Sequence, residues 1–302
     1  MQRVGQGAVT IWLAATLAFL MLRVLPGDAI ETQLVFSGAG AEVIAERRAA
    51  LGLDLPLRSQ YLQFISGLLT GNLGYSLLDG QPVTVKIGQQ LAPTVTLALG
   101  ALVFAVIGGV GLGVTASFSI GWGISQLAQV VTDMALSMPI YWTGTLAIYV
   151  FTVWLGVLPS AGAGRISQFV LPVSVLGFHT AGAIARVTAV NLHEIKGAAF
   201  VRTAHAKGLP GWAVVLRHIL PAGLPPVISI IALQAGFLFS GTVITESLFV
   251  RPGIGRLLLD SVLRQDYPVV QGVVVFSAAI YVILSLIADT LYRLLDPRVA
   301  VA

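Results

Sequence analysis

Long uncharged intervals divide this chain into apolar segments. A transmembrane helix needs about 20 mainly apolar residues, so an interval of roughly 18 residues without Asp, Glu, Lys or Arg is a candidate span. Four intervals each predict a single span: Arg3–Arg23, Arg165–Arg186, Arg217–Glu246 and Asp266–Asp289.

The interval from Lys86 to Asp133 is too long for one helix. We divide it at Gly121-Trp122-Gly123, which is a turn signal, into one span near 94–117 and the start of another near 126. The second of these contains Asp133 and Pro139 and is expected to continue to about Leu155. The pattern therefore predicts an all-α membrane protein with about six transmembrane helices.

The stretch 26–92 is more polar than the rest of the chain. We expect a water-exposed, mostly helical segment with a short amphipathic helix over 41–51, ended by Gly52, and turns at Gly71-Asn72 and Asp79-Gly80. The expected organisation is therefore a first part over 1–92, one transmembrane helix plus an extracytoplasmic segment, and a membrane core over 93–295. Six of the 13 acidic residues lie in this stretch: Asp28, Glu31, Glu42, Glu46, Asp54 and Asp79.

Composition supports the membrane assignment. Hydrophobic residues make up 56% of the 302 residues and charged residues only 10%, whereas a soluble domain has roughly 25% charged residues. The chain has no cysteine, which excludes disulfides, iron–sulfur clusters and thiolate zinc sites. The first 30 residues resemble a signal peptide, but the apolar run is long enough to span and no small-x-small cleavage site follows it.

Several kinds of chemistry are absent from the sequence. No Lys follows a Gly, so there is no GxxxxGK[ST] phosphate loop, and the four histidines lack HExxH or HxxH spacing. We therefore expect no cofactor, no metal site and no enzymatic activity. Asp133, Glu246 and Asp289 lie near predicted span ends, where extension of the side chain to the interface is the simplest explanation. Of these, Glu246 is the candidate for a role at the pore mouth.

The basic residues suggest an orientation. Lys196, Arg202, Lys207 and Arg217 lie in the connection over 190–221, opposed there only by Glu194. The positive-inside rule then places this connection and both termini in the cytoplasm. The connection 118–125 has no Lys or Arg and the outer stretch 249–268 has three Arg, so this preference is modest.

The polar loop over 191–221 is the most informative segment. It is helix-like on both sides of Gly208-Leu209-Pro210-Gly211, and the small residues Ala204, Ala206 and Gly208 stand beside basic ones. Small side chains allow a helix to lie close in a groove of a partner, while basic groups fix its rim. An interfacial helix on anionic lipid would have the same composition, and the residues alone do not separate the two interpretations.

The run Arg202-Thr203-Ala204-His205-Ala206-Lys207-Gly208-Leu209, followed by Arg217-His218 and Pro221, resembles the cytoplasmic EAA loop of ABC importer permeases. The similarity is closest to the dipeptide/oligopeptide/nickel family, although Gly197-Ala198-Ala199 stands where that family usually has acids. Further blocks occur in the family order: Leu25-Pro26-Gly27-Asp28, Leu51-Gly52-Leu53-Asp54-Leu55-Pro56, Gly71-Asn72-Leu73-Gly74-Tyr75-Ser76, Ser137-Met138-Pro139, Glu246-Ser247-Leu248-Phe249, Pro252-Gly253-Ile254-Gly255, Asp266-Tyr267-Pro268 and Leu295-Asp296-Pro297-Arg298.

This resemblance implies a type I ABC importer permease fold in a multi-pass protein of the bacterial or archaeal cytoplasmic membrane. It implies the membrane-spanning subunit of an ATP-driven, binding-protein-dependent importer for di- or oligopeptides, with nickel chelates, glutathione or another small solute as variants. Residues 202–209 would contact the ATPase. The implied partners are a second, non-identical permease, two ABC ATPase subunits that hydrolyse the ATP, and an extracytoplasmic binding protein, with no nucleic acid.

Two other functions are considered. A gradient-driven secondary transporter or channel would work without a nucleotide-binding partner and would depend on an ion gradient. A membrane-embedded enzyme would need a polar catalytic cluster at membrane depth, and the sequence contains no such set.

Overall fold

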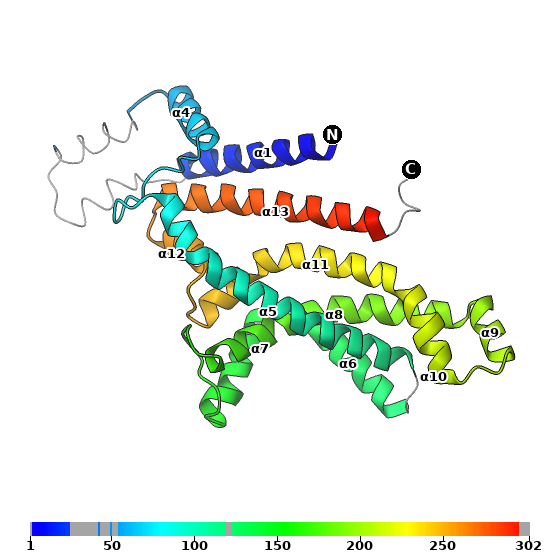
Figure 1. The fold of residues 1–302 in the computed structure, drawn as a ribbon. Coiled ribbons are helices and arrows are strands. Elements are labelled where there is room, and N and C mark those ends of the chain that lie inside the picture. Colours follow the sequence, from blue (N-terminus) through cyan, green and yellow to red (C-terminus); the bar gives the residue numbers. More distant parts are fainter. Residues whose placement is uncertain (1, 25–41, 43–48, 50–53, 119–121, 296–302) are drawn as a thin grey trace. The chain divides into compact units, whose positions relative to one another are not determined.

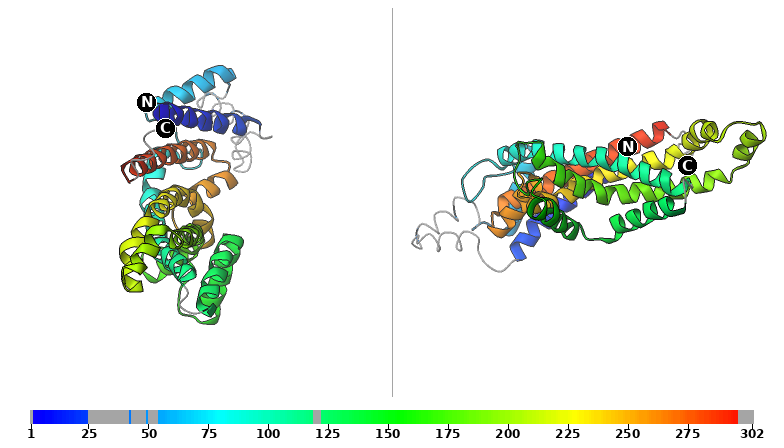
Figure 2. Two further views of the ribbon diagram at one scale, coloured as in Figure 1. Left: turned by 90° about the vertical axis from the view of Figure 1, so that its right-hand side faces the viewer. Right: turned by 90° about the horizontal axis from the view of Figure 1, so that it is seen from below.

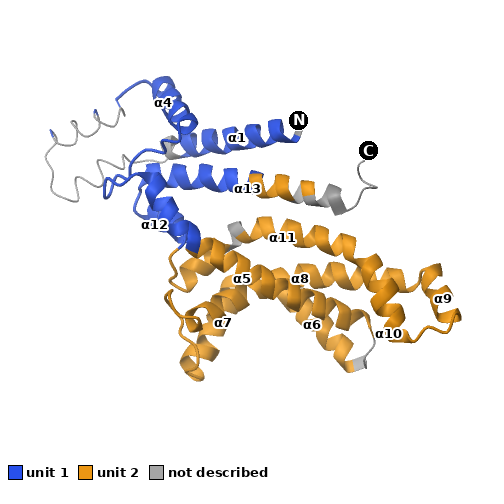
Figure 3. Ribbon diagram, in the orientation of Figure 1, with its two compact units in different colours: residues 1–92, 253–282 blue, residues 93–252, 283–302 orange. Residues whose placement is uncertain are grey.

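The computed structural model describes residues 2–24, 42, 49, 54–118 and 122–295. Several predicted features lie outside these residues: the block at 25–28, the helix over 41–51 with Gly52, most of the block at 51–56, the turn at Gly121, and the block at 295–298 beyond its first residue. The chain forms two compact units, residues 1–92 with 253–282 and residues 93–252 with 283–302 (Figure 3).

The described residues contain five helices that are long and apolar enough to cross a membrane, or six if one bent pair counts as a single span. This confirms the prediction of about six spans. The spans, labelled in Figure 1, are α1 (Gln2–Val24), α5 (Val83–Ser117), the bent pair, α8 (Ser167–Lys196), α11 (Leu220–Leu248) with the turns before it, and α13 (Tyr267–Leu295).

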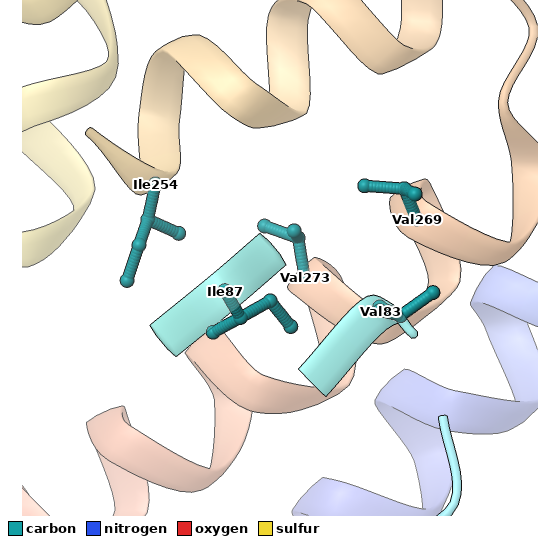
Figure 4. Close-up of a cluster of buried hydrophobic side chains, with 5 residues drawn as sticks. All are labelled: Val83, Ile87, Ile254, Val269 and Val273. Atoms are coloured by element: carbon teal, nitrogen blue, oxygen red, sulfur yellow. The ribbon is translucent and has the colours of Figure 1, made fainter. Parts of the chain in front are cut away.

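The second span begins earlier than predicted. We expected it to start near 94, but α5 begins at Val83 and is 35 residues long. One side of the added turns is packed, because Val83 and Ile87 are buried against Val269 and Val273 of α13 and Ile254 of α12 (Ile254–Leu263) (Figure 4). Apolar contacts within the first unit thus extend this helix toward its N-terminus, beyond Lys86, at which the uncharged interval begins.

The third span is broken, not continuous. α6 (Trp122–Ser137) and α7 (Ile140–Ala147), which continues into the π-helix η1 (Ile148–Trp154), meet at 112°. The break coincides with Pro139, which lacks an N–H, disfavours helical geometry at the residue before it and precedes α7 as its N-cap. His179 of α8 braces the bend, donating from Nδ1 to the Ala135 carbonyl at 2.9 Å and lying 2.7 Å through Nε2 from the Thr143 hydroxyl.

Close helix packing organises the second unit. A Cβ on Gly109 would lie 2.7 Å from the Ala181 carbonyl oxygen, and one on Gly113 would lie 2.5 Å from Thr188 Cβ. These glycines therefore let α5 approach α8 closely and form a helix-packing face.

In the first unit, α4 (Leu57–Leu69) packs beside α1 through Tyr61, whose hydroxyl lies 2.8 Å from that of Thr16. The predicted turns at Gly71 and Gly80 are confirmed, with φ of 75° and 69°. The Ser76 hydroxyl donates to Asp266 Oδ2 at 2.5 Å, so two blocks 190 positions apart in sequence meet at one buried carboxylate.

Candidate functional site

The loop over 191–221 contains the short helix α9 (Ala199–Ala206), whose inner side is packed on the second unit. Val201 and Ala204 are 3% and 5% exposed and belong to one apolar cluster with Leu192 of α8, Val214 of α10 (Gly211–Val214) and Ile219 of the π-helical turn η2 (Val215–Ile219). Because α8 and α11 both enter this cluster, α9 is fixed to the ends of two spans.

The outer side of α9 faces solvent. Within 202–209 the exposed residues are Arg202, Thr203, His205, Ala206, Lys207 and Gly208. Ala204 and Leu209 instead pack inward, so of the small residues in this block only Ala206 and Gly208 are exposed. Figure 1 and the right-hand view of Figure 2 place α9 at the end of α8 that is far from α7.

Gly208 ends α9 in a Schellman motif. Its N–H donates to the His205 carbonyl at 2.9 Å, and the Leu209 N–H donates to the Ala204 carbonyl at 3.3 Å. Gly208 has a φ of 77°, and a Cβ there would meet nothing within 4 Å. The glycine is therefore needed for its backbone conformation and not for space within this chain.

Two exposed apolar side chains beyond α9 were not predicted. Trp212 and Leu216 are 64% and 57% exposed, while Ala213 and Val214 beside them are buried. The i, i+4 spacing of Trp212 and Leu216 could have indicated a shared helical face, given the start signal Pro210-Gly211. With Phe200, which is 46% exposed, they give this end of the unit an apolar as well as a basic surface.

Lys196 anchors the loop at its start. Its ammonium group donates to the Ser117 carbonyl at the end of α5 and lies 4.0 Å from the centre of the Phe118 ring. A lysine on a helix C-terminal carbonyl satisfies an acceptor that the helix itself leaves open. Lys196, predicted only as a loop charge, thus ties the ends of α5 and α8 together.

Glu246 lies at the end of α11 and is 0% exposed. The prediction that its side chain extends to the interface is therefore wrong. Thr94 of α5 donates to Glu246 Oε1 at 2.6 Å, within the second unit. In this structure the carboxylate has no accessible surface, and its role at a pore mouth stays a prediction.

Arg251 follows α11 and is 4% exposed. Its guanidinium donates to the carbonyls of Gly162 at 3.3 Å and Gln168 at 3.1 Å. Burial lowers the pKa of Arg251, and the nearby charge of Glu246 raises it. The two residues thus place opposite charges near one another at the C-terminal end of α11.

Asp133, another of the three acids near predicted span ends, pairs with Arg186 across α6 and α8. The pair lies in a cavity of about 340 Å³ within the second unit. The side chain of Asp289 lies outside the described residues. Among the described residues, no group of three or more His, Cys, Asp or Glu could hold a metal ion.

Comparison with known proteins gives consistent matches along the chain. The family model "binding-protein-dependent transport system inner membrane component" matches residues 109–301, and the model of the N-terminal part of such components matches residues 1–98. The glutathione transport system permease protein GsiC of Escherichia coli K12 is 35% identical over 290 residues, which cover 96% of this chain and 94% of that protein. Its counterpart in Salmonella typhimurium is 34% identical over the same length.

Solved structures show the same fold. An inward-facing MetNI methionine ABC transporter gives a TM-score of 0.60 at 15% identity, covering 70% of this chain and 96% of the matched chain. An amino acid ABC transporter crystallised with histidines gives 0.54 at 18% identity, covering 71% and 94%. These likenesses establish the architecture of a type I ABC importer permease.

Proposed function

Because the chain belongs to the family of inner membrane components of binding-protein-dependent transport systems, and so is the membrane-spanning permease of an ABC importer, we propose that the outer side of α9 is the surface on which a separate ATPase subunit acts. Two such ATPases would supply all ATP hydrolysis. The conformational change of alternating access would take place in the permease itself.

The observation that carries this proposal is the two-sided construction of α9. Its outer side presents three basic residues, Arg202, His205 and Lys207, while Val201 and Ala204 fix its inner side to α8 and to the start of α11. A force on the outer side would therefore be passed to two spans through a packed cluster. Packed interfaces tend to switch between discrete arrangements, which suits alternating access.

The proposed orientation follows from the same basic residues. Both termini and the loop over 191–221 would be cytoplasmic, in agreement with the positive-inside rule. The segment 26–92 and the stretch Phe249 to Tyr267 would then face outward and receive an extracytoplasmic binding protein. A second, non-identical permease would complete the path. Loss of binding-protein stimulation when these outer segments are replaced would support this arrangement, and unchanged stimulation would contradict it.

We further propose small peptides as the cargo. The relatives at 34–35% identity are named as glutathione permeases, and glutathione is itself a small peptide with a free amino group and free carboxylates. A nickel chelate is the competing cargo. Uptake of labelled peptides, in competition with reduced glutathione and with nickel, would distinguish them in cells that carry the whole system.

The coupling proposal is tested with Ala206→Asp. Ala206 is exposed on α9 and needs no unusual backbone conformation. A carboxylate here would offset the basic charge of this side and would have to be desolvated on docking, so we expect at least about a tenfold loss of co-purified ATPase. Gly208→Asp is less suitable, because its φ of 77° would strain any side chain.

The matched control is Ala163→Asp, the same change at an exposed alanine in the loop before α8. It should retain the ATPase, and both variants should keep the apparent Tm of the wild type. Retention of ATPase and transport by Ala206→Asp would refute the assigned surface. A wild-type chain that purifies alone and transports in vesicles without ATP would favour the gradient-driven alternative.

A further inference from the structure

An open cavity of about 340 Å³, with an ion pair and several polar side chains among its lining residues, lies in the second unit. It is formed by the end of α5, the middle of α6 and the last third of α8. Its size is at the lower end of the range for small-molecule sites. The lining residues are Ala116, Ser117, Gln129, Thr132, Asp133, Arg186, Ala189, Val190 and His193.

The cavity contains an ion pair that remains accessible. Arg186 Nη2 donates to Asp133 Oδ1, yet the two side chains are 56% and 60% exposed. Both residues belong to helices of candidate spans, where charges usually face a water-filled path or a partner because lipid exposure is costly. An exposed ion pair contributes little to folding, so a ligand can separate its members at small cost.

The other polar groups differ in availability. The hydroxyls of Ser117 and Thr132 are buried and already donate to carbonyls of their own helices. Gln129 of α6 and His193 of α8 are exposed. They are suited to bind the amide groups of a short peptide, since both can donate and accept hydrogen bonds.

We infer that this cavity binds the cargo in transit, with Arg186 taking the carboxylate of a small zwitterionic peptide and Asp133 taking its ammonium group. This inference rests on the proposed peptide cargo and assigns two residues that the cargo would contact on its way through the permease. A zwitterion replaces one ion pair by two and leaves no charge unpaired. Arginine can bind a carboxylate through two parallel hydrogen bonds, which favours this exchange.

The position of the cavity fits release toward the cytoplasm. Arg186 precedes Lys196, the last residue of α8, by ten positions, which is roughly 15 Å along a helix. Movement of α9, which packs on Leu192 of the same helix, would therefore reach the cavity directly. A cargo site on α8 would place substrate release under the control of the coupling loop.

The test uses the permease complex with its ATPase, without binding protein, in detergent. Three dipeptide probes are compared at about 10 mM: glycylglycine, N-acetylglycylglycine and glycylglycinamide. We expect glycylglycine to raise the apparent Tm, and each blocked analogue to bind about tenfold more weakly, because each loses one charge-assisted contact. This series needs no variant.

Two variants then assign the contacts. Arg186→Gln should abolish the preference for a free carboxylate, and Asp133→Asn should abolish the preference for a free ammonium group. Arg165→Gln, an exposed arginine outside the cavity, and Asp260→Asn, from the exposed pair of Asp260 with Arg256, should leave the ligand-induced shift unchanged.

Equal responses to all three peptides, or no response from a complex that still hydrolyses ATP under control of the permease, would overturn the inference and leave the proposed function intact. A preference for free termini that survives in both cavity variants would also overturn it. Failure of the chain to associate with any ATPase would instead refute the proposed function.

Discussion

The ends of α9 and α11 share one hydrogen-bond pattern but differ in the residue at its critical position. At the end of α11, the Arg251 N–H donates to the Glu246 carbonyl at 2.8 Å and the Val250 N–H donates to Ser247 at 3.3 Å, the same Schellman arrangement that ends α9 at Gly208. The central residue is glycine in α9, with φ 77°, and valine in α11, with φ 49°.

The surroundings explain why one end tolerates a strained residue. A β-branched residue at positive φ costs about 1–3 kcal/mol and persists only where other contacts fix the backbone. Beside Val250, Phe249 is 1% exposed, Glu246 0% and Arg251 4%. Gly208 has solvent around it and no atoms within 4 Å of an added Cβ. Buried neighbours thus hold the positive φ of Val250 at the end of α11, whereas at the end of α9 glycine itself allows the positive φ.

The largest expected effect comes from removing the packing at the α11 end. Phe249 lies in a cluster with Leu171 and Val175 of α8. Phe249→Ala should destabilise the chain by about 3–5 kcal/mol, as is usual for a buried phenylalanine. The matched control is Phe200→Ala on α9, where the ring is 46% exposed and the cost should be below about 1 kcal/mol. Thermal unfolding in detergent compares the two. Equal losses would contradict the contrast between a buried and an exposed end.

Gly208→Ala addresses the exposed end. A Cβ meets no atoms there, so the full cost is the conformational strain of a left-handed residue, about 1–2 kcal/mol. Gly211→Ala is the control, because Gly211 also has nothing within 4 Å but begins α10 at an ordinary φ. That change should be neutral or slightly stabilising. If both variants behave alike, the backbone conformation does not explain the glycine.

Val250→Gly should have the opposite sign. Relief of strain exceeds the added entropy of the unfolded chain, so we expect a gain of about 0.5 kcal/mol. Val262→Gly in α12 is matched in exposure, 51% against 49% for Val250, but lies in a regular helix. It should lose about 1 kcal/mol. Losses of similar size in both would mean that packing has removed the strain at Val250.

The sequence predicted features that depend on local residues and missed features that depend on contacts with distant ones. Charge gaps located the spans, since the cost of a charge in lipid acts on every residue of a span independently of its neighbours. The break at Pro139 was missed because prolines occur in intact spans too, as Pro172 does in α8. The start of α5 was missed because it depends on residues of α13, which no local pattern contains.

The candidate site divides in the same way. Residues 202–209 were identified as one block by resemblance, but the division into exposed and inward residues depends on how α9 lies on α8. Neither the pairing of Asp133 with Arg186 nor that of Glu246 with Thr94 has a sequence signal, since their partners are 53 and 152 positions away. The local pattern of residues therefore could not predict these long-range contacts between polar groups.

A third helix end, in the first unit, gives the smallest expected effect. α12 ends in the same motif with Gln265 at φ 57°, and the next residue, Asp266, is buried and accepts hydrogen bonds from the Ser76 hydroxyl and the Leu77 N–H. Lys86 donates to Ser76 at 3.3 Å and to Asp79 at 2.7 Å. Buried contacts again accompany a residue with a positive φ. Here they adjoin the pair of Lys86 with Asp79, whose effect on stability depends on pH.

The hydrogen bond from Lys86 holds the pKa of Asp79 below its usual value. A depressed pKa means that the folded state binds the proton less well than the unfolded state. The stabilisation is therefore present above the ordinary pKa of an aspartate and is lost as pH falls through the lower, folded value. The Asp79 side chain is 42% exposed, so solvent screening limits the effect to a few tenths of a kcal/mol. Asp79→Asn should lower the apparent Tm slightly at pH 7 and converge with the wild type near pH 3. Lys86→Gln should remove the same pH-dependent difference, because the shift arises from the pair; a difference that persists in the Lys86→Gln background would assign it to another partner of Asp79.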